Sequence, residues 1–276
     1  MIDLMVYKVR EKDTNFIELE KEYWNKIVCK DYDKVNFKKF NDSKRNKKIV
    51  NLKIDPSNST NLINMCKNDD MLLYFFILMV FKITINKYTQ STNFLIGIPQ
   101  YIKADEKADD EKSKNLFIVL DNGINQENSF KEEIIRARKE ILDAYVYQFH
   151  DLQELYMLND VHNKVNVYCC MKNIHNFSQL ENILHLSNNE LTLVVEKNAN
   201  SIGVEFNYWD SSISNEIEII TSMFINVLNN IIKNVLIKIK DIEIVSTEEK
   251  HNLLVEFNNT AVDYLRNKTI NELFEE

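Results

Sequence analysis

Apolar residues recur along the chain at two spacings, one typical of amphipathic helices and the other typical of buried strands. Helical spacing predicts helices over residues 15–29 and 214–234, the second with its apolar side chains on one stripe. Alternating or short continuous apolar runs predict strands over residues 48–54, 93–99, 115–120, 165–171, 191–196 and 202–208. This mixture predicts an α/β sandwich with a mixed sheet covered by helices.

One apolar run is long enough to require a choice between a membrane and a protein core. Residues 71–81 are all apolar and end at Lys82, whereas a helix that spans a bilayer needs about 20 apolar residues. We therefore expect a buried core helix over residues 70–88 and no membrane association.

Capping signals predict further helix starts. Pro56 follows Asp55, which places proline in the first turn of a helix. Ser129 and Glu132 have capping-box spacing, ahead of an amphipathic helix that runs to about residue 148. The same spacing recurs at residues 246/249 and 269/272, which predicts two short helices near the end.

Charge and composition exclude some classes of function. The chain has 276 residues and a formal net charge of −8, from 34 Lys and Arg against 42 Asp and Glu. An acidic chain repels nucleic acid at long range, so we expect no nucleic-acid partner. The 45% of hydrophobic and 28% of charged residues are ordinary for a globular chain, and the length allows one large domain or two modest ones.

The cellular setting follows from the N-terminus and the cysteines. No basic stretch followed by an apolar one opens the chain, so no secretory signal is predicted. The four cysteines, Cys29, Cys66, Cys169 and Cys170, form no CxxC motif. A reduced, cytoplasmic protein fits these features.

Common catalytic motifs are missing from the sequence. Its three glycines allow neither GxGxxG nor a P-loop, and there is no GxSxG or HExxH. The five histidines are widely separated, and we interpret them as isolated surface or loop residues. The carboxylates of residues 105–111 lie in the most hydrophilic segment, where no burial would raise their pKa. We therefore assign no catalytic, cofactor-binding or metal-binding residue.

A specific pattern occupies residues 246–276, where STEEKHNLLVEFNNT is followed by a tyrosine and then by TINELFE. It resembles the connector that leads from a condensation domain into an adenylation domain in nonribosomal peptide synthetases. The residues that match are Glu249, Leu253, Leu254, Phe257, Asn258, Thr260, Tyr264, Thr269, Ile270, Glu272, Leu273, Phe274 and Glu275.

The resemblance extends less sharply over nearly the whole chain. Segments similar to the condensation family are residues 3–7 (D-[FY]-A-V-W), 23–24 (Y-W), 88–99 (Y-T-G … I-G-x-P), 190–193 (D-L-T-L) and 206–210 (Y-N-x-x-L-F). The chain departs from the family at residues 147–153, which keep Gln148 and little else of H-Q-D-x-P-F-E. It also departs at Leu120, where N-T-x-x-x-R has its arginine, although Asn115 is retained.

The resemblance implies that residues 1–245 are the C-terminal lobe of a condensation domain and that residues 246–276 begin the linker to an adenylation domain. Such domains resemble two fused lobes of the chloramphenicol-acetyltransferase kind with a tunnel between them. Carrier proteins deliver acyl groups tethered to 4′-phosphopantetheine, and an amide bond forms inside. The implied partners are a peptidyl carrier protein, the N-terminal lobe and an adenylation domain.

The family's catalytic H-H-x-x-x-D-G motif belongs to the N-terminal lobe, and no H-x-x-x-D occurs in this sequence. We therefore expect a lobe of a peptide synthetase that is inactive alone and binds no cofactor itself. The alternative is a non-catalytic half-domain that docks a carrier protein or a separately encoded N-terminal lobe. Apolar lobe surface without its cover also predicts self-association.

Two segments have expected places in the family's architecture. Residues 173–190 fall where the C-terminal lobe sends an excursion across to brace the N-terminal lobe. From its residues alone the segment is a long surface loop, and our hypothesis is that it is disordered or packs on a neighbour when the other lobe is missing. Residues 100–113, which are highly charged, are expected to contribute to the tunnel floor.

Overall fold

The computed structural model describes residues 14–37, 46–102, 117–121, 123–209, 213, 216–246, 250 and 254. The chain divides into two compact units, Met1–Ile244 and Val245–Glu276. All elements named here belong to the first unit. In chain order they are α2 (Thr14–Val28), β1 (Lys47–Lys53), α3 (Pro56–Met65), α4 (Asp70–Thr89), β2 (Leu95–Ile98), β3 (Ile118–Asp121), α5 (Phe130–Val146), α6 (Gln153–Leu158), α7 (Val161–Lys164), β4 (Val167–Met171), α8 (Phe177–Leu184), β5 (Leu191–Lys197), β6 (Ile202–Trp209), α10 (Ile217–Lys233) and η1 (Ile239–Asp241).

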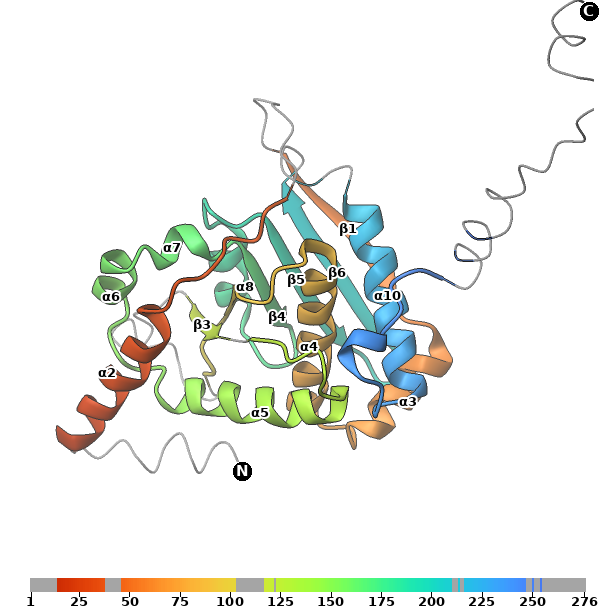
Figure 1. Cartoon of the computed structure of the whole chain (residues 1–276), viewed down its shortest axis with the longest axis horizontal. Coiled ribbons are helices and arrows are strands. Elements are labelled where there is room, and N and C mark those ends of the chain that lie inside the picture. Colours follow the sequence, from red (N-terminus) through yellow and green to blue (C-terminus); the bar gives the residue numbers. More distant parts are fainter. Residues whose placement is uncertain are drawn as a thin grey trace, which may run out of the picture. The chain divides into compact units, whose positions relative to one another are not determined.

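The six strands of the described residues form one mixed sheet in the order β1-β6-β5-β4-β2-β3 (Figure 1). β6 is antiparallel to both β1 and β5, β4 is parallel to β5 and β2, and β3 is antiparallel to β2. Every residue of β2 and β4 is buried, as in strands covered on both faces, whereas β1 at the edge is largely exposed. The predicted α/β sandwich with a mixed sheet is confirmed.

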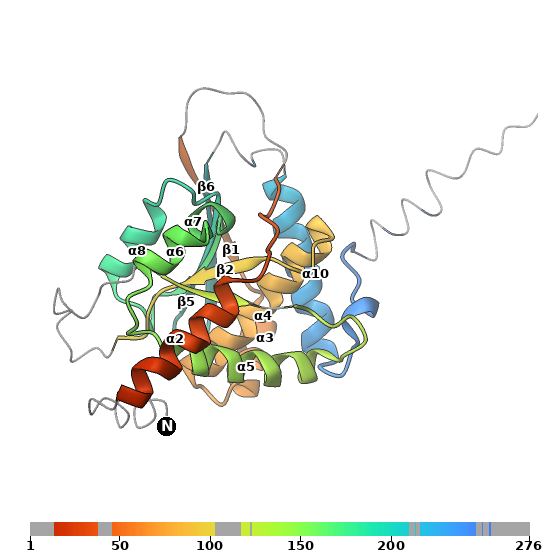
Figure 2. The same cartoon turned by 60° about the vertical axis from the view of Figure 1, so that its left-hand side comes forward.

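Helices cover both faces of the sheet, but unequally. α3, α4 and α10 lie on one side and α8 lies on the other (Figure 2). On the first side, Phe206 of β6 meets Phe81 of α4 and Phe224 of α10 edge to face, with ring centroids 6.2 and 5.4 Å apart. These buried rings tie the sheet to its main helical layer.

α4 is the core helix that the sequence predicts. Its residues from Leu73 to Asn86 are all buried. Among the described residues it is the one helix with the length and apolar composition of a membrane span, and 78% of the apolar window is buried inside the protein. Burial within the protein explains the apolar sequence.

The capping signals in the first unit form as predicted. The Asp55 carboxylate accepts hydrogen bonds from the backbone N–H (2.9 Å) and hydroxyl (2.6 Å) of Ser57 at the start of α3. The Ser129 N–H donates to the Glu132 carboxylate (2.7 Å), and the Glu132 N–H donates to the Ser129 hydroxyl (3.3 Å). The pairs at 246/249 and 269/272 include residues outside the described part of the chain.

The prediction of a long surface loop over residues 173–190 is wrong. This segment contains α8, which begins with a capping box formed by Asn176 and Gln179. Leu180 and Ile183 of α8 are buried, and they pack within their own chain. Helix α8 therefore belongs to the sandwich, whereas most of the expected tunnel-floor segment, from residue 103 onward, lies outside the described residues.

Candidate functional site

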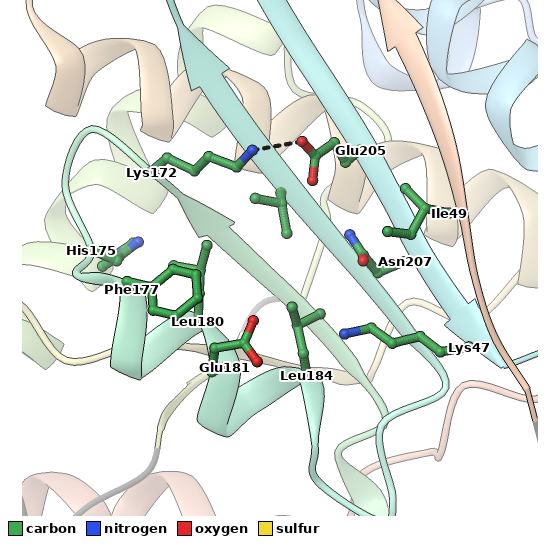
Figure 3. Close-up of a pocket in the computed structure, with 11 residues that line it drawn as sticks. Lys47, Ile49, Lys172, His175, Phe177, Leu180, Glu181, Leu184, Glu205 and Asn207 are labelled. Carbon is green, nitrogen blue, oxygen red and sulfur yellow. Dashed lines mark hydrogen bonds and ion pairs between the residues drawn. The ribbon is translucent and has the colours of Figure 1, made fainter.

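A cavity of about 330 Å³ lies between α8 and the face of the sheet opposite to α4. The sheet register brings its wall together, because Val194 of β5 pairs with Glu205 of β6 and Ile49 of β1 pairs with Asn207 of β6. Figure 3 shows Ile49, Glu205 and Asn207 on the sheet, across from the side chains of α8. The wall consists of Lys47, Ile49, Lys172, His175, Phe177, Leu180, Glu181, Leu184, Val194, Glu205 and Asn207.

An ion-pair cluster lies at one end of the cavity. The ammonium of Lys172, just after β4, lies 2.6 Å from the Glu205 carboxylate (Figure 3). It also lies 3.0 Å from the carboxylate of Glu196. Desolvation opposes the charged form, but hydrogen bonds to Glu205 and Glu196 outweigh it and raise the pKa of Lys172. The lysine stays charged and paired at neutral pH, so it cannot serve as a base.

Asn207 places a polar group in the middle of the cavity wall. Its side chain is 5% exposed, and its Nδ2 has no hydrogen-bond partner among the described residues. A buried amide N–H without a partner costs about 1–3 kcal/mol of folding free energy. The nitrogen itself is covered by surrounding atoms, so this donor lies beneath the cavity wall.

His175 lies in the loop between β4 and α8, which agrees with the interpretation of the histidines as surface or loop residues, but it is not at the surface: it is 3% exposed and lines the cavity. Its Nδ1 accepts a hydrogen bond from the backbone N–H of Met171 (3.0 Å), and its Nε2 lies 3.4 Å from the Tyr145 hydroxyl. Burial lowers the pKa of His175 to about 3. The ring is neutral at physiological pH and too weak a base for general acid–base catalysis there.

Acid should destabilise the protein through this ring. The unfolded chain takes up the proton near pH 6.5 and the folded chain near pH 3, so the stabilisation is complete above pH 6.5 and is lost as the pH falls toward 3. Between pH 6.5 and 4 the loss should reach about 3 kcal/mol, at about 1.4 kcal/mol per pH unit. A ¹⁵N-imidazole NMR titration and urea unfolding check this, with the exposed His185→Gln as control. Protonation of folded His175 near pH 6.5 would contradict it.

The other histidines do not gather at the cavity. His150 and His162 are half-buried, and desolvation lowers the pKa of each. His185 is exposed, with Nδ1 2.8 Å from the Glu181 carbonyl oxygen. His251 lies outside the described residues.

Buried acids and thiols provide no alternative catalytic group at the cavity. Desolvation raises the pKa of Glu20 to about 7, but this residue lies in α2 and does not line the cavity. Burial also raises the pKa of Cys66, Cys169 and Cys170, so these thiols stay protonated and weakly nucleophilic. All four cysteines are free. Within the described ranges, no three His, Cys, Asp or Glu side chains lie close enough together to hold a metal ion.

Gln148, the residue kept from the family's H-Q-D-x-P-F-E pattern, is fully buried after α5. Its Oε1 accepts from the backbone N–H of Tyr101 (2.7 Å), and its Nε2 donates to the Tyr101 carbonyl (2.8 Å). The amides of Gln100 and Gln179 extend this network: the first donates to the Gln148 carbonyl (2.6 Å), and the second donates to the Gln100 carbonyl (2.8 Å). The three glutamines join the ends of β2 and α5 to α8.

Two other residues at family positions are also buried. Glu190, at the aspartate position of D-L-T-L, forms a 3.1 Å ion pair with Lys34. Leu120, at the arginine position, is a buried residue of β3. The charge of an arginine is thus replaced by apolar packing in the sheet.

Comparison with known proteins shows to which family this chain belongs. The family described as Condensation domain matches residues 7–254. The chain belongs to the condensation-domain family. Gramicidin S synthase 2 from Brevibacillus brevis is 25% identical over 303 residues, an alignment that covers 99% of this chain and 7% of that protein. Tyrocidine synthase 3 from Brevibacillus parabrevis is 26% identical over 229 residues, which cover 74% of this chain and 3% of that protein.

Solved structures of condensation domains share the fold. A four-domain nonribosomal peptide synthetase bound to AMP and glycine superposes with a TM-score of 0.67 at 11% identity, over 88% of this chain and 21% of that one. The first condensation domain of the calcium-dependent antibiotic synthetase, in complex with a substrate analogue, gives 0.63 at 8% identity, over 83% of this chain and 54% of that one. The chloramphenicol-acetyltransferase-like fold implied by the sequence resemblance is thereby confirmed.

Proposed function

We propose that this chain is the C-terminal lobe of a condensation domain whose parent joins carrier-bound aminoacyl or peptidyl groups by an amide bond, and that it is inactive without the other lobe. The proposal is supported above all by the share of a whole condensation domain that this chain covers. The chain aligns along 83% of its own length with only 54% of the antibiotic synthetase domain. It spans less than a tenth of the length of the curated relatives named above.

The chemistry of amide formation supports the need for a second lobe. The donor thioester is attacked by the acceptor amine, a C–N bond forms, the C–S bond breaks, and the proton lost by the amine ends on the released thiol. This transfer needs a positioned base, or donors that stabilise the tetrahedral intermediate, in a site that excludes water. In the described part of the chain, His175 is neutral and hydrogen-bonded, and Lys172 is held by two carboxylates. We infer that the missing H-H-x-x-x-D-G motif must come from the N-terminal lobe.

The proposed partners follow from the same assignment. A peptidyl carrier protein would present each substrate on 4′-phosphopantetheine, which is part of the substrate and not a cofactor of this chain. The N-terminal lobe would complete the tunnel. Residues 246–276 would lead into an adenylation domain, and the reaction would take place in the cytoplasm. Apolar lobe surface without its partner would favour self-association.

An assay with and without the N-terminal lobe tests the proposal. The chain is incubated with a carrier-bound aminoacyl donor and a carrier-bound acceptor, and the acceptor carrier is analysed by mass spectrometry for a dipeptidyl group. We expect no product from the chain alone, and product when the polypeptide encoded directly before it is added. Substitution of the second histidine of the added motif is the control. Product formation by the chain alone would refute the assignment.

The second candidate is a non-catalytic docking module. One structure of the same fold is the complex of the X-domain with OxyB from teicoplanin biosynthesis, which has a TM-score of 0.66 at 12% identity over 89% of this chain and 59% of that one. In that structure a domain of this fold binds another protein. If this candidate is correct, a carrier protein or a separate lobe should co-elute with the chain in gel filtration, and adding the lobe should still yield no amide product.

A further inference from the structure

The sheet has an accessible edge at β1. Among the described strands β1 pairs with β6 alone, and it forms the end of the sheet (Figure 1). Five of its seven residues are exposed and the other two are half-buried. The opposite edge differs, because Ile118, Val119 and Leu120 of β3 are buried and the Tyr156 ring stacks at 5.6 Å on Phe117, just before that strand.

The register of β1 shows which of its backbone groups face outward. The Ile54 N–H donates to the Ile202 carbonyl (3.2 Å), which continues the β1–β6 ladder by one residue. Hydrogen-bonded and non-hydrogen-bonded pairs alternate along an antiparallel ladder. The even-numbered residues of β1 therefore bond to β6, whereas the N–H and C=O groups of Ile49, Asn51 and Lys53 point away from it. No other described residue pairs with these outward groups.

The side chains along this edge are cationic. β1 has the sequence KKIVNLK, which contains three lysines and no acidic residue. Lys47 and Lys53 lie at its two ends, both exposed, and neither forms an ion pair with a described residue. They share one face of the strand with Ile49, which is 51% exposed. Lys47 and Ile49 also line the cavity beside α8, so this face is the α8 side of the sheet (Figure 3).

The charges indicate what kind of strand this edge accepts. If a second copy paired with β1 in the antiparallel sense, Lys47 of one copy would lie opposite Lys53 of the other, and like charges directly opposite are destabilising. Lysines on an edge strand are a common protection against such self-pairing. A strand with carboxylates at the two matching positions is attracted instead, and its backbone gains the hydrogen bonds that an open edge offers.

We propose that the outer edge of β1 binds an extended acidic segment of another protein as an added antiparallel strand. The backbone of that segment pairs with Ile49, Asn51 and Lys53. Two acidic side chains, six residues apart, lie beside Lys47 and Lys53, and an apolar side chain between them lies beside Ile49. This interaction involves no carrier-bound substrate and does not depend on the amide-forming reaction.

A seven-residue peptide, acetyl-ETVTVTE-amide, tests binding to the ¹⁵N-labelled full chain by NMR and hydrogen exchange. The amides of Ile49, Asn51 and Lys53 should exchange rapidly in the free chain and slowly in the complex. Those of Val50 and Leu52 should be protected in both states. Binding should weaken as salt is added, because the lysines are exposed. The absence of binding refutes the proposal, and so does protection of other amides only.

Two control peptides separate charge from backbone pairing. Acetyl-KTVTVTK-amide should not bind, since it brings lysines against lysines. The acidic peptide with both valine nitrogens methylated keeps its side chains but lacks the two donors that face β1, so it should bind about tenfold more weakly or worse. Equal binding of either control would show that the contact is not the proposed added strand.

Variants of β1 test the edge itself. Asn51→Pro removes an N–H that points away from β6, a position where an edge strand tolerates proline. It should keep the melting temperature within a few degrees and weaken peptide binding about tenfold or more, whereas Asn51→Thr should bind like the unmodified chain. Lys47→Glu combined with Lys53→Glu changes exposed side chains only and should reverse the preference toward acetyl-KTVTVTK-amide. An unchanged preference in this double variant refutes the proposal even if Asn51→Pro does not fold.

The same amides also report on a different occupant. If Ile49, Asn51 and Lys53 become protected in the free chain as its concentration rises, the edge is an interface between two copies and the proposal is overturned. None of these measurements uses a carrier protein or a second lobe. Their failure would therefore leave the amide-forming assay unaffected, and a negative assay would leave the edge-binding result unaffected.

Discussion

Replacing Gly97 by alanine is expected to destabilise the protein by about 3 kcal/mol, the upper end for overpacking a core. Gly97 of β2 pairs with Tyr168 of β4, and the tyrosine ring lies over it. A Cβ at position 97 would be 2.4 Å from two carbons of that ring and 3.3 Å from a methyl of Val165. Real Cβ contacts do not come this close, so the ring or the strand must move.

The ring has little freedom to move. The Tyr168 hydroxyl donates to the Val165 carbonyl (3.2 Å) and accepts from the Asn188 amide (3.1 Å). Its ring also meets Phe117 edge to face at 5.3 Å. A shift away from a new methyl group would therefore break several contacts at once, which is why we expect a cost near the upper end.

Urea unfolding measures this cost, with a glycine of the same sheet as control. Gly203 in β6 would place its Cβ no nearer than 3.9 Å to any atom, so Gly203→Ala should be neutral or stabilising by up to about 1 kcal/mol. In a Tyr168→Ala background, Gly97→Ala should cost less than about 1 kcal/mol, because the clash is gone. An equal cost in both backgrounds would show that the ring is not the cause.

The strands and the core helix could be predicted because their sequence patterns depend on burial alone. β4 and β5 are apolar runs in the middle of the sheet, and α4 is surrounded by protein. The helix α8 was missed for a local reason. Its capping box uses Asn176 and Gln179 instead of the serine or threonine and glutamate pairs that mark the predicted starts, and its eight residues make a short apolar stripe.

The candidate site could not be derived from sequence because strand register assembles it. Lys172 and Glu205 are separated by β5 in the chain, and only the β4–β5–β6 pairing brings their charges to 2.6 Å. His175 is a loop residue, as the sequence indicates, but its burial and the 3.4 Å approach of its Nε2 to the Tyr145 hydroxyl of α5 could not be derived from the sequence. Asn207 lay in a recognised family segment, yet the missing partner of its amide is visible only in three dimensions.

Replacing Gln148 by leucine is expected to destabilise the protein by about 3 kcal/mol. The side-chain amide pairs with both the N–H and the C=O of Tyr101, as a neighbouring strand would. Leucine fills a similar volume but leaves both backbone groups without these partners, at about 1–3 kcal/mol for each group that stays buried. Water that reaches the half-buried Tyr101 reduces the total.

Two further variants isolate the hydrogen bonds from packing. Gln148→Glu keeps an acceptor for the Tyr101 N–H but brings a carboxylate oxygen against the Tyr101 carbonyl, so it should not restore stability. Gln126→Leu removes one part-buried hydrogen bond, from Nε2 to the Asn86 Oδ1 (3.0 Å), and should cost only about 1 kcal/mol. Urea unfolding at pH 7 measures the free energy of unfolding of Gln148→Leu, Gln148→Glu and Gln126→Leu. Wild-type stability in either Gln148 variant would contradict the structural role.

Gln148 is kept from the family pattern, but its surroundings indicate a structural role. A glutamine kept within a family pattern can be taken for a group that contacts substrate, and its substitution would then reduce activity with stability unchanged. The geometry around Gln148 predicts instead that its substitution reduces stability, since its amide is fully buried and hydrogen-bonded to Tyr101. The loss of stability should therefore be measurable on this chain alone, without carrier, substrate or second lobe. Any loss of amide formation in the completed domain should be a consequence of displacing Gln100 and Tyr101, which Gln148 holds in place after β2.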